Sequence, residues 1–125
     1  MSIDVRVARR ADVAALARVL GRAFEDDPVF RWLQPDAGTR RAALPGFFRA
    51  LARHHYLAGG GVEVATGSGP GSGAGSGAGD GLGCGVGAVA AWDPPGRPEQ
   101  SMRSQVAMLP AVVRAFRGRL GVARA

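Results

Sequence analysis

The chain has 125 residues, of which 46% are hydrophobic, which is enough to build one globular domain. Its net charge is +6 and all sixteen basic residues are arginine, but no arginine run exceeds two residues, so we do not expect a nucleic-acid partner. The single cysteine, Cys84, excludes an internal disulfide, and the lack of an apolar leader or an 18-residue apolar run argues against export or a membrane partner, so we expect a cytoplasmic protein.

The N-terminal elements are predicted to be a strand followed by two helices. Apolar residues at positions 3, 5 and 7 alternate with polar ones, which predicts a strand with one buried face. Asp12 is the expected N-cap of a helix with one apolar stripe, formed by Val13, Leu16, Ala17, Leu20 and Phe24. Pro28 ends this helix and starts a short second helix that runs to Leu33.

A third helix and two strands follow. This helix begins near Thr39, or at Pro45 if that proline is its first residue, and it ends at Leu57 before three glycines. Residues 61–65 and 86–92 are predicted strands of a hairpin, with the glycine-rich residues 66–85 as its expanded flexible loop. Glycine holds only odd positions in this tract and the chain has no lysine, so neither GxGxxG nor a P-loop can form there.

The C-terminal segment is predicted to be a helix that starts after Ser101 and is kinked at Pro110. Its apolar stripe consists of Met102, Val106, Leu109, Val113, Phe116 and Leu120. The order β-α-α-β-β-α predicts an α+β fold in a single domain, 1–125, with helices packed on a small antiparallel sheet. The stripe needs a partner surface, and the strand 86–92 would have an open edge.

Three stretches together resemble the N-terminal half of a bacterial subgroup of the GNAT-superfamily N-acetyltransferases. They are ARVLGRAFEDDPVFRWLQP at 17–35, RHHY at 53–56 and AAWDPPG at 90–96. The resemblance implies a partial GNAT-like fold and transfer of acetyl from acetyl-CoA, as co-substrate, to a small-molecule or peptide amine. It also implies that the helix pair after the first strand forms one wall of the acceptor pocket.

The cofactor signature of that family, Q/R-x-x-G-x-G/A, occurs once, at Arg18–Ala23. This match lies inside the first predicted helix, where the amides already bond within the helix and cannot hold a phosphate. We therefore assign no cofactor-binding residue. The expectation is an incomplete, acceptor-side part of the enzyme that neither binds acetyl-CoA tightly nor turns over by itself.

The candidate substrate-binding residues are Asp27, Phe30, Trp32 and Trp92. Asp27 either binds a cationic amine or caps the helix that begins at Pro28, and the two roles are compatible. Trp32 either lines the pocket or packs with one edge in water. The catalytic residues remain unknown, and no metal ligand is assigned.

Two histidines, His54 and His55, lie at the end of the third predicted helix. Their spacing does not suit a metal pair, which would use positions i and i+4 on one helix face. Either imidazole has the chemistry of a base, but we expect them to interact with the C-terminal dipole of the helix.

An alternative function is a non-enzymatic interaction module. In that case the open strand edge and the C-terminal helix bind a partner chain, including a second copy to give a homodimer.

Overall fold

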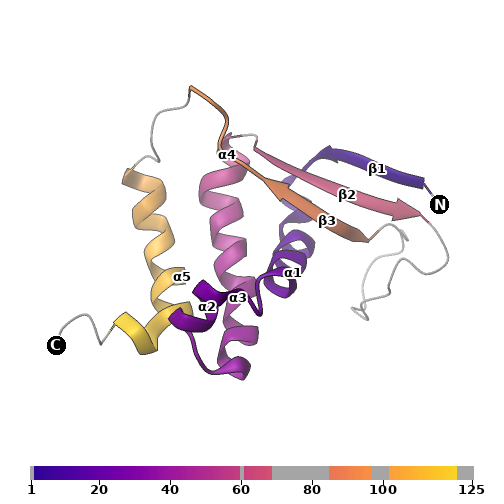
Figure 1. The fold of residues 1–125 in the computed structure, drawn as a ribbon. Coiled ribbons are helices and arrows are strands. Elements are labelled where there is room, and N and C mark those ends of the chain that lie inside the picture. Colours follow the sequence, from indigo (N-terminus) through magenta and orange to yellow (C-terminus); the bar gives the residue numbers. More distant parts are fainter. Residues whose placement is uncertain (1, 60, 69–84, 97–101, 121–125) are drawn as a thin grey trace.

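The computed structural model describes residues 2–59, 61–68, 85–96 and 102–120, and these form a mixed α+β fold (Figure 1). The predicted α+β class is confirmed, but the structure has more than two helices between the first and the second strand, so the predicted order β-α-α-β-β-α is wrong at that point. The glycine-rich residues 69–84 lie outside the described part. The elements are β1 (Ser2–Val7), the 3-10 turn η1 (Arg10–Asp12), α1 (Val13–Ala23), α2 (Pro28–Leu33), α3 (Ala37–Leu51), the π-helical turn η2 (Ala52–Tyr56), α4 (Leu57–Gly59), β2 (Val62–Ser68), β3 (Val86–Ala91) and α5 (Met102–Leu120).

The three strands form one antiparallel sheet in the order β1-β2-β3. Strand β2 runs three residues further than predicted, because Thr66, Gly67 and Ser68 pair with the first residues of β1. The β2–β3 ladder shifts register between Ala65 and Thr66. Since β2 is the central strand, its two valines, Val62 and Val64, are the residues that the helices can cover completely.

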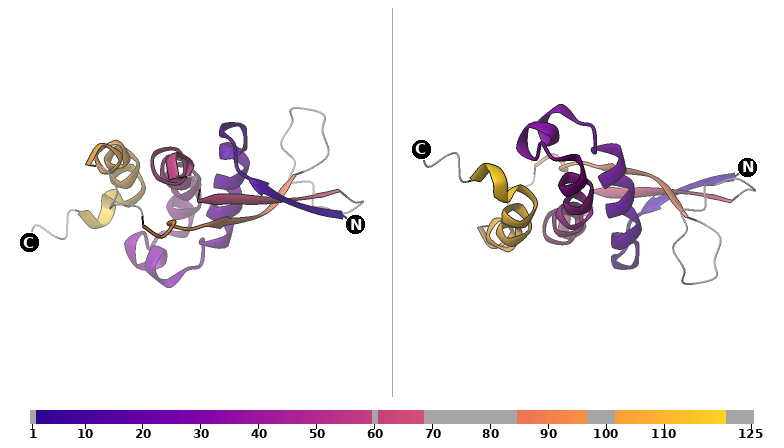
Figure 2. Two further views of the ribbon diagram at one scale, coloured as in Figure 1. Left: turned by 90° about the horizontal axis from the view of Figure 1, so that it is seen from above. Right: turned by 90° about the horizontal axis from the view of Figure 1, so that it is seen from below.

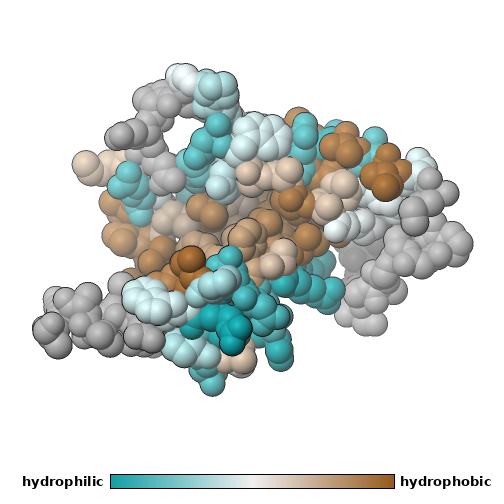
Figure 3. All heavy atoms as spheres, viewed as in Figure 1, coloured by the Kyte–Doolittle hydropathy of each residue, from teal (hydrophilic) through white to brown (hydrophobic). Residues whose placement is uncertain are grey.

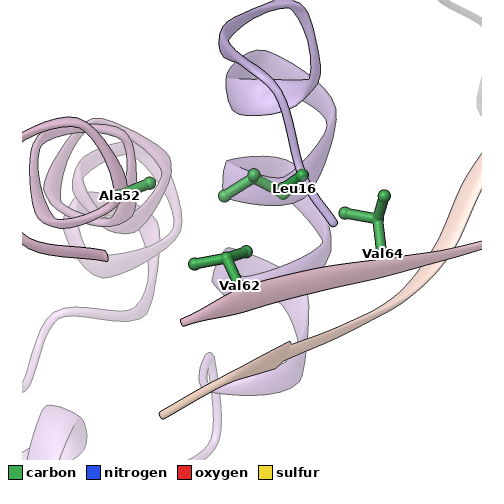
Figure 4. Packing of buried hydrophobic residues seen from close by; sticks show 5 residues of the cluster. Leu16, Ala52, Val62 and Val64 are labelled. Atoms are coloured by element: carbon green, nitrogen blue, oxygen red, sulfur yellow. The ribbon is translucent and has the colours of Figure 1, made fainter. Parts of the chain in front are cut away.

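The main core lies between this central strand and the helices. Leu16 of α1, Ala52 of η2 and the valines Val62 and Val64 of β2 point toward one another (Figure 4). Helices α5, α3 and α1 stand side by side, with α3 in the middle (Figures 1 and 2). Each fully buried aliphatic side chain of this kind contributes about 1.5–3 kcal/mol relative to an exposed one.

A second, aromatic core joins four helices. Phe30 of α2 lies between Phe47 and Phe48 of α3 and Phe116 of α5, with ring centroids 5.7, 5.8 and 5.9 Å away. Phe24, at the end of α1, completes the cluster at 5.9 Å from Phe30. Edge-on and offset aromatic pairs of this kind add about 0.5–1.5 kcal/mol beyond their buried area.

Helix α3 begins at Ala37, and Pro45 lies in its interior. The alternative start at Pro45 is therefore wrong. The reason is a cap: the Asp36 carboxylate accepts hydrogen bonds from the Thr39 N–H and hydroxyl, both at 2.7 Å. This cap starts the helix two turns before the proline.

Two predicted apolar faces are not buried. The β1 strand is confirmed, but Ile3, Val5 and Val7 remain 55–68% exposed, so its predicted buried face is wrong. The reason is that these side chains point to the sheet face away from α1, since they share that face with Glu63 and Ala65 of β2. Figure 3 shows apolar surface over β1 on this side.

Helix α5 also differs from its predicted orientation. Its stripe residues Met102, Val106, Leu109 and Val113 are exposed, whereas Met108, Ala115 and Phe116 are buried. Non-helical backbone angles occur at Phe116 rather than at Pro110. The contact of α5 with α3 covers Phe116, the one stripe residue that is buried, together with Met108 and Ala115, and it leaves the four earlier stripe residues exposed.

Asp12 takes the predicted N-cap position of α1, but its side chain makes no cap hydrogen bond to that helix. Its carboxylate instead accepts the Arg9 N–H at 2.7 Å and binds the Arg6 guanidinium with two contacts of 2.8 Å. The Arg6 hydrogen bond is the main cause that lowers the pKa of Asp12 below its usual range, despite partial burial. Asp12 thus fastens the end of β1 to the turn η1.

Candidate functional site

A histidine–aspartate pair is the most distinctive polar contact of the described residues. The His55 Nε2 atom lies 2.5 Å from an Asp93 carboxylate oxygen. The His55 side chain is 16% exposed and that of Asp93 is 72% exposed, so the pair lies at the surface with its imidazole mostly covered. His55 also lies in the last turn of η2, and its expected interaction with the dipole of the helix end stays a prediction.

Two local features bring these residues together. Residues 52–56 form a π-helical turn, a form that is often found at functional sites, and the chain continues as α4 before it turns at Gly61. The Trp92 N–H then donates to the Gly61 carbonyl at 2.8 Å, so the chain leaving β3 passes close to η2. Asp93 is therefore held by the sheet and His55 by the helix.

The neighbours of the pair are aromatic. The Tyr56 ring is edge-on to the His55 ring at 4.6 Å, and burial raises the pKa of the Tyr56 phenol, with a further rise caused by the Asp93 carboxylate. Trp92, one residue before Asp93, is 42% exposed. The site thus combines a carboxylate, an imidazole and aromatic surface.

The structure places the four candidate substrate-binding residues in two regions. Asp27 is the N-cap of α2, where its carboxylate accepts the Val29 and Phe30 N–H groups at 2.9 and 3.3 Å. Phe30 belongs to the aromatic core, and Trp32 on the same helix is 62% exposed. The cap interpretation of Asp27 is confirmed, while its role toward an amine stays a prediction.

Trp92 does not belong to the same region as the α2 residues. Phe30 contacts Phe47 and Phe48, whereas Trp92 pairs with Gly61, beyond the far end of α4 (Figure 1). Along the axis of the helical segment from α3 to α4, Phe47 and Gly61 are about 20 Å apart, at a rise of about 1.5 Å per residue. Trp92 instead belongs with His55, Tyr56 and Asp93.

The pair has a defined acid–base chemistry. A carboxylate beside one ring nitrogen selects the tautomer in which Nε2–H donates to Asp93, which leaves Nδ1 of His55 as the proton acceptor. The exposed carboxylate also attracts a cation. Within the described ranges, no three His, Cys, Asp or Glu side chains are grouped to hold a metal ion.

Sequence reasoning did not find this pair. His55 and Asp93 are 38 residues apart along the chain, and no sequence motif links them. The predicted helix ends before Gly59 and the predicted strand ends before Pro94, so no local signal connects the two ends.

Comparisons with protein-family models, with curated proteins and with solved structures give no match. The GNAT resemblance therefore stays a prediction from the sequence. In the part of the chain that the structure describes, no helix has both the length and the apolar character needed to cross a bilayer.

Proposed function

We propose that this chain supplies the acceptor side of a GNAT-like N-acetyltransferase, which transfers acetyl from acetyl-CoA to an amine. The observation that carries the proposal is the His55–Asp93 pair at the surface beside Trp92. The small antiparallel sheet with helices packed on it supports the proposal, because the GNAT resemblance implies a sheet of this kind.

The roles follow from the chemistry of the reaction. An amine arrives as a cation, which the exposed Asp93 carboxylate attracts. The amine must lose a proton before its nitrogen can attack a thioester, and the free imidazole nitrogen of His55 accepts that proton. The proposed acceptors are primary amines of small molecules or peptides, and Trp92 contacts their apolar part.

Amine binding to this chain is the direct test, since we expect no turnover by the chain alone. Saturation-transfer NMR with a panel of primary alkylamines and a lysine peptide should show binding at millimolar concentration. Asp93→Asn should abolish it, whereas Asp4→Asn, which removes an exposed carboxylate on β1, should leave it unchanged. Equal binding by both variants, or no binding by the native chain, contradicts the proposal.

Two further measurements check the arrangement. Tyr56 is the sole tyrosine, so the ultraviolet absorbance of its phenolate reports its pKa, which Asp93→Asn should lower because the carboxylate raises it. An unchanged phenol pKa argues against the position of Asp93. Calorimetry with acetyl-CoA should show no micromolar binding by the chain alone.

A second candidate function is self-association, for which the exposed apolar residues provide the observation. Among the described strands, β1 and β3 are the edges of the sheet, and α5 presents Met102, Val106, Leu109 and Val113 to solvent. We favour a second copy of this chain as the partner for these surfaces, because antiparallel pairing of a strand edge with the same edge of another copy extends both sheets at once.

Sedimentation distinguishes this candidate from the first. A homodimer should form at micromolar concentration, and Val106→Ser together with Val113→Ser should give monomers with an unchanged melting temperature. A native chain that remains monomeric at high concentration and melts cooperatively excludes it.

A further inference from the structure

A basic cleft lies on the side of η2 and α4 that faces the end of β1. Its volume is about 650 Å³, and four of its lining residues carry basic side chains: Arg9, Arg10, Arg53 and His54. The other lining residues are alanines and a leucine, so none of the described residues that line the cleft is acidic. Segments more than forty residues apart in the sequence thus bring several basic groups to one concave surface.

The neighbouring carboxylate, Asp12, balances the charges of this cleft only in part, through its Coulomb attraction to Arg9. Asp12 lies beside Arg9, whose N–H it accepts at 2.7 Å, but its two oxygens bind the Arg6 guanidinium at 2.8 Å. Within the described ranges, no ion pair engages Arg9, Arg10 or Arg53. Like charges gathered in a concave surface focus a positive potential there, which favours a multivalent anion.

We infer that this cleft binds a small molecule through a diphosphate group. A guanidinium matches two phosphate oxygens with two parallel N–H donors, and three arginines match an anion of two or three charges. A single carboxylate would leave two of the three guanidinium groups without a partner. The volume lies in the range of small-molecule sites, about 300–1,000 Å³.

The test is titration of the chain with inorganic pyrophosphate at constant ionic strength, followed by amide NMR. Saturable shifts confined to residues 8–10 and 53–58 are expected. Arg10→Gln together with Arg53→Gln should weaken binding by about tenfold or more, since each removes a charge-assisted hydrogen bond. Arg22→Gln together with Arg31→Gln is the matched control, because both arginines are exposed and lie outside the cleft lining.

Three results overturn the inference. They are the absence of saturable shifts, equal weakening by the two double variants, and shifts spread over all the arginines, which would indicate general attraction of anions to a basic protein. A nucleoside diphosphate serves as a second probe: tighter binding than pyrophosphate indicates a nucleotide ligand, and equal binding indicates recognition of the phosphates alone. Amide spectra of the double variants also show whether they are folded.

Discussion

Arg40 is a buried cation that holds together the segment around α2. It is 5% exposed, and its guanidinium donates to the carbonyls of Glu25, Gln34 and Pro35 at 2.6, 2.8 and 3.2 Å. These carbonyls follow the ends of α1 and α2, where helix dipoles are negative, so backbone groups make the direct contacts that stabilise the buried charge. The Asp36 carboxylate adds a Coulomb attraction without direct contact. Among the described residues, no carboxylate lies within ion-pair distance of it.

Replacing this side chain tests the argument quantitatively. A hydrogen bond from a charged donor contributes about 1.5–3 kcal/mol, while the burial of the charge opposes folding, so Arg40→Met should lower the free energy of unfolding by about 2–4 kcal/mol. In a domain of about 100 described residues, this lowers the melting temperature by roughly 10 °C or more. The stability of Arg40→Lys should lie between those of the native protein and Arg40→Met, because an ammonium group cannot reach all three carbonyls.

Urea unfolding followed by circular dichroism is the assay for Arg40. Arg49→Met is the control, since this arginine is exposed on the same helix and its loss should change stability by less than about 0.5 kcal/mol. If Arg40→Met is as stable as the control variant, the three carbonyl contacts do not stabilise the fold and the reasoning fails.

Further substitutions test the close approach of the backbone at Gly61 and the ion pair between Arg6 and Asp12. Gly61→Ala should destabilise the protein by about 1–3 kcal/mol, because the added Cβ would overlap the Trp92 carbonyl. Gly46→Ala in α3 is its control: the added Cβ meets no atom, and the variant should be more stable than the native protein by about 0.5–1 kcal/mol. Equal urea midpoints of the two variants would contradict the close approach of Gly61 to Trp92. Asp12→Asn should lower the urea midpoint at pH 7. The Arg6 contact lowers the pKa of Asp12 on folding, so its stabilisation is present above the unfolded pKa of about 3.9 and is lost as pH falls through the lower folded value. The two midpoints should therefore converge as the pH falls below about 3.9, and a constant difference would exclude this cause.

The local elements were largely predictable. The stripe of α1, the start of α2 at Pro28 and the two hairpin strands depend on residues a few positions apart, and all three appear in the structure. The strand residues Thr66 to Ser68 were missed because their small polar side chains look like loop, although pairing with β1 makes them strand.

The candidate site was predictable only in part. Asp27 as a cap follows from its place before Pro28, and the structure confirms that role. The partners of His55 and Arg40 could not be predicted, because each contact crosses between elements and depends on how the helices stand against the sheet.

The sequence by itself determined where helices and strands form, because hydrophobic period and capping act within one or two turns of the chain. Tertiary structure decided which apolar face is covered. Val5 and Val106 satisfy the same local patterns as buried residues, yet both are exposed. Val5 lies on the sheet face away from α1, and α5 turns Phe116 toward α3. Only packing chooses among the faces of an element, and that same choice brought His55 to Asp93.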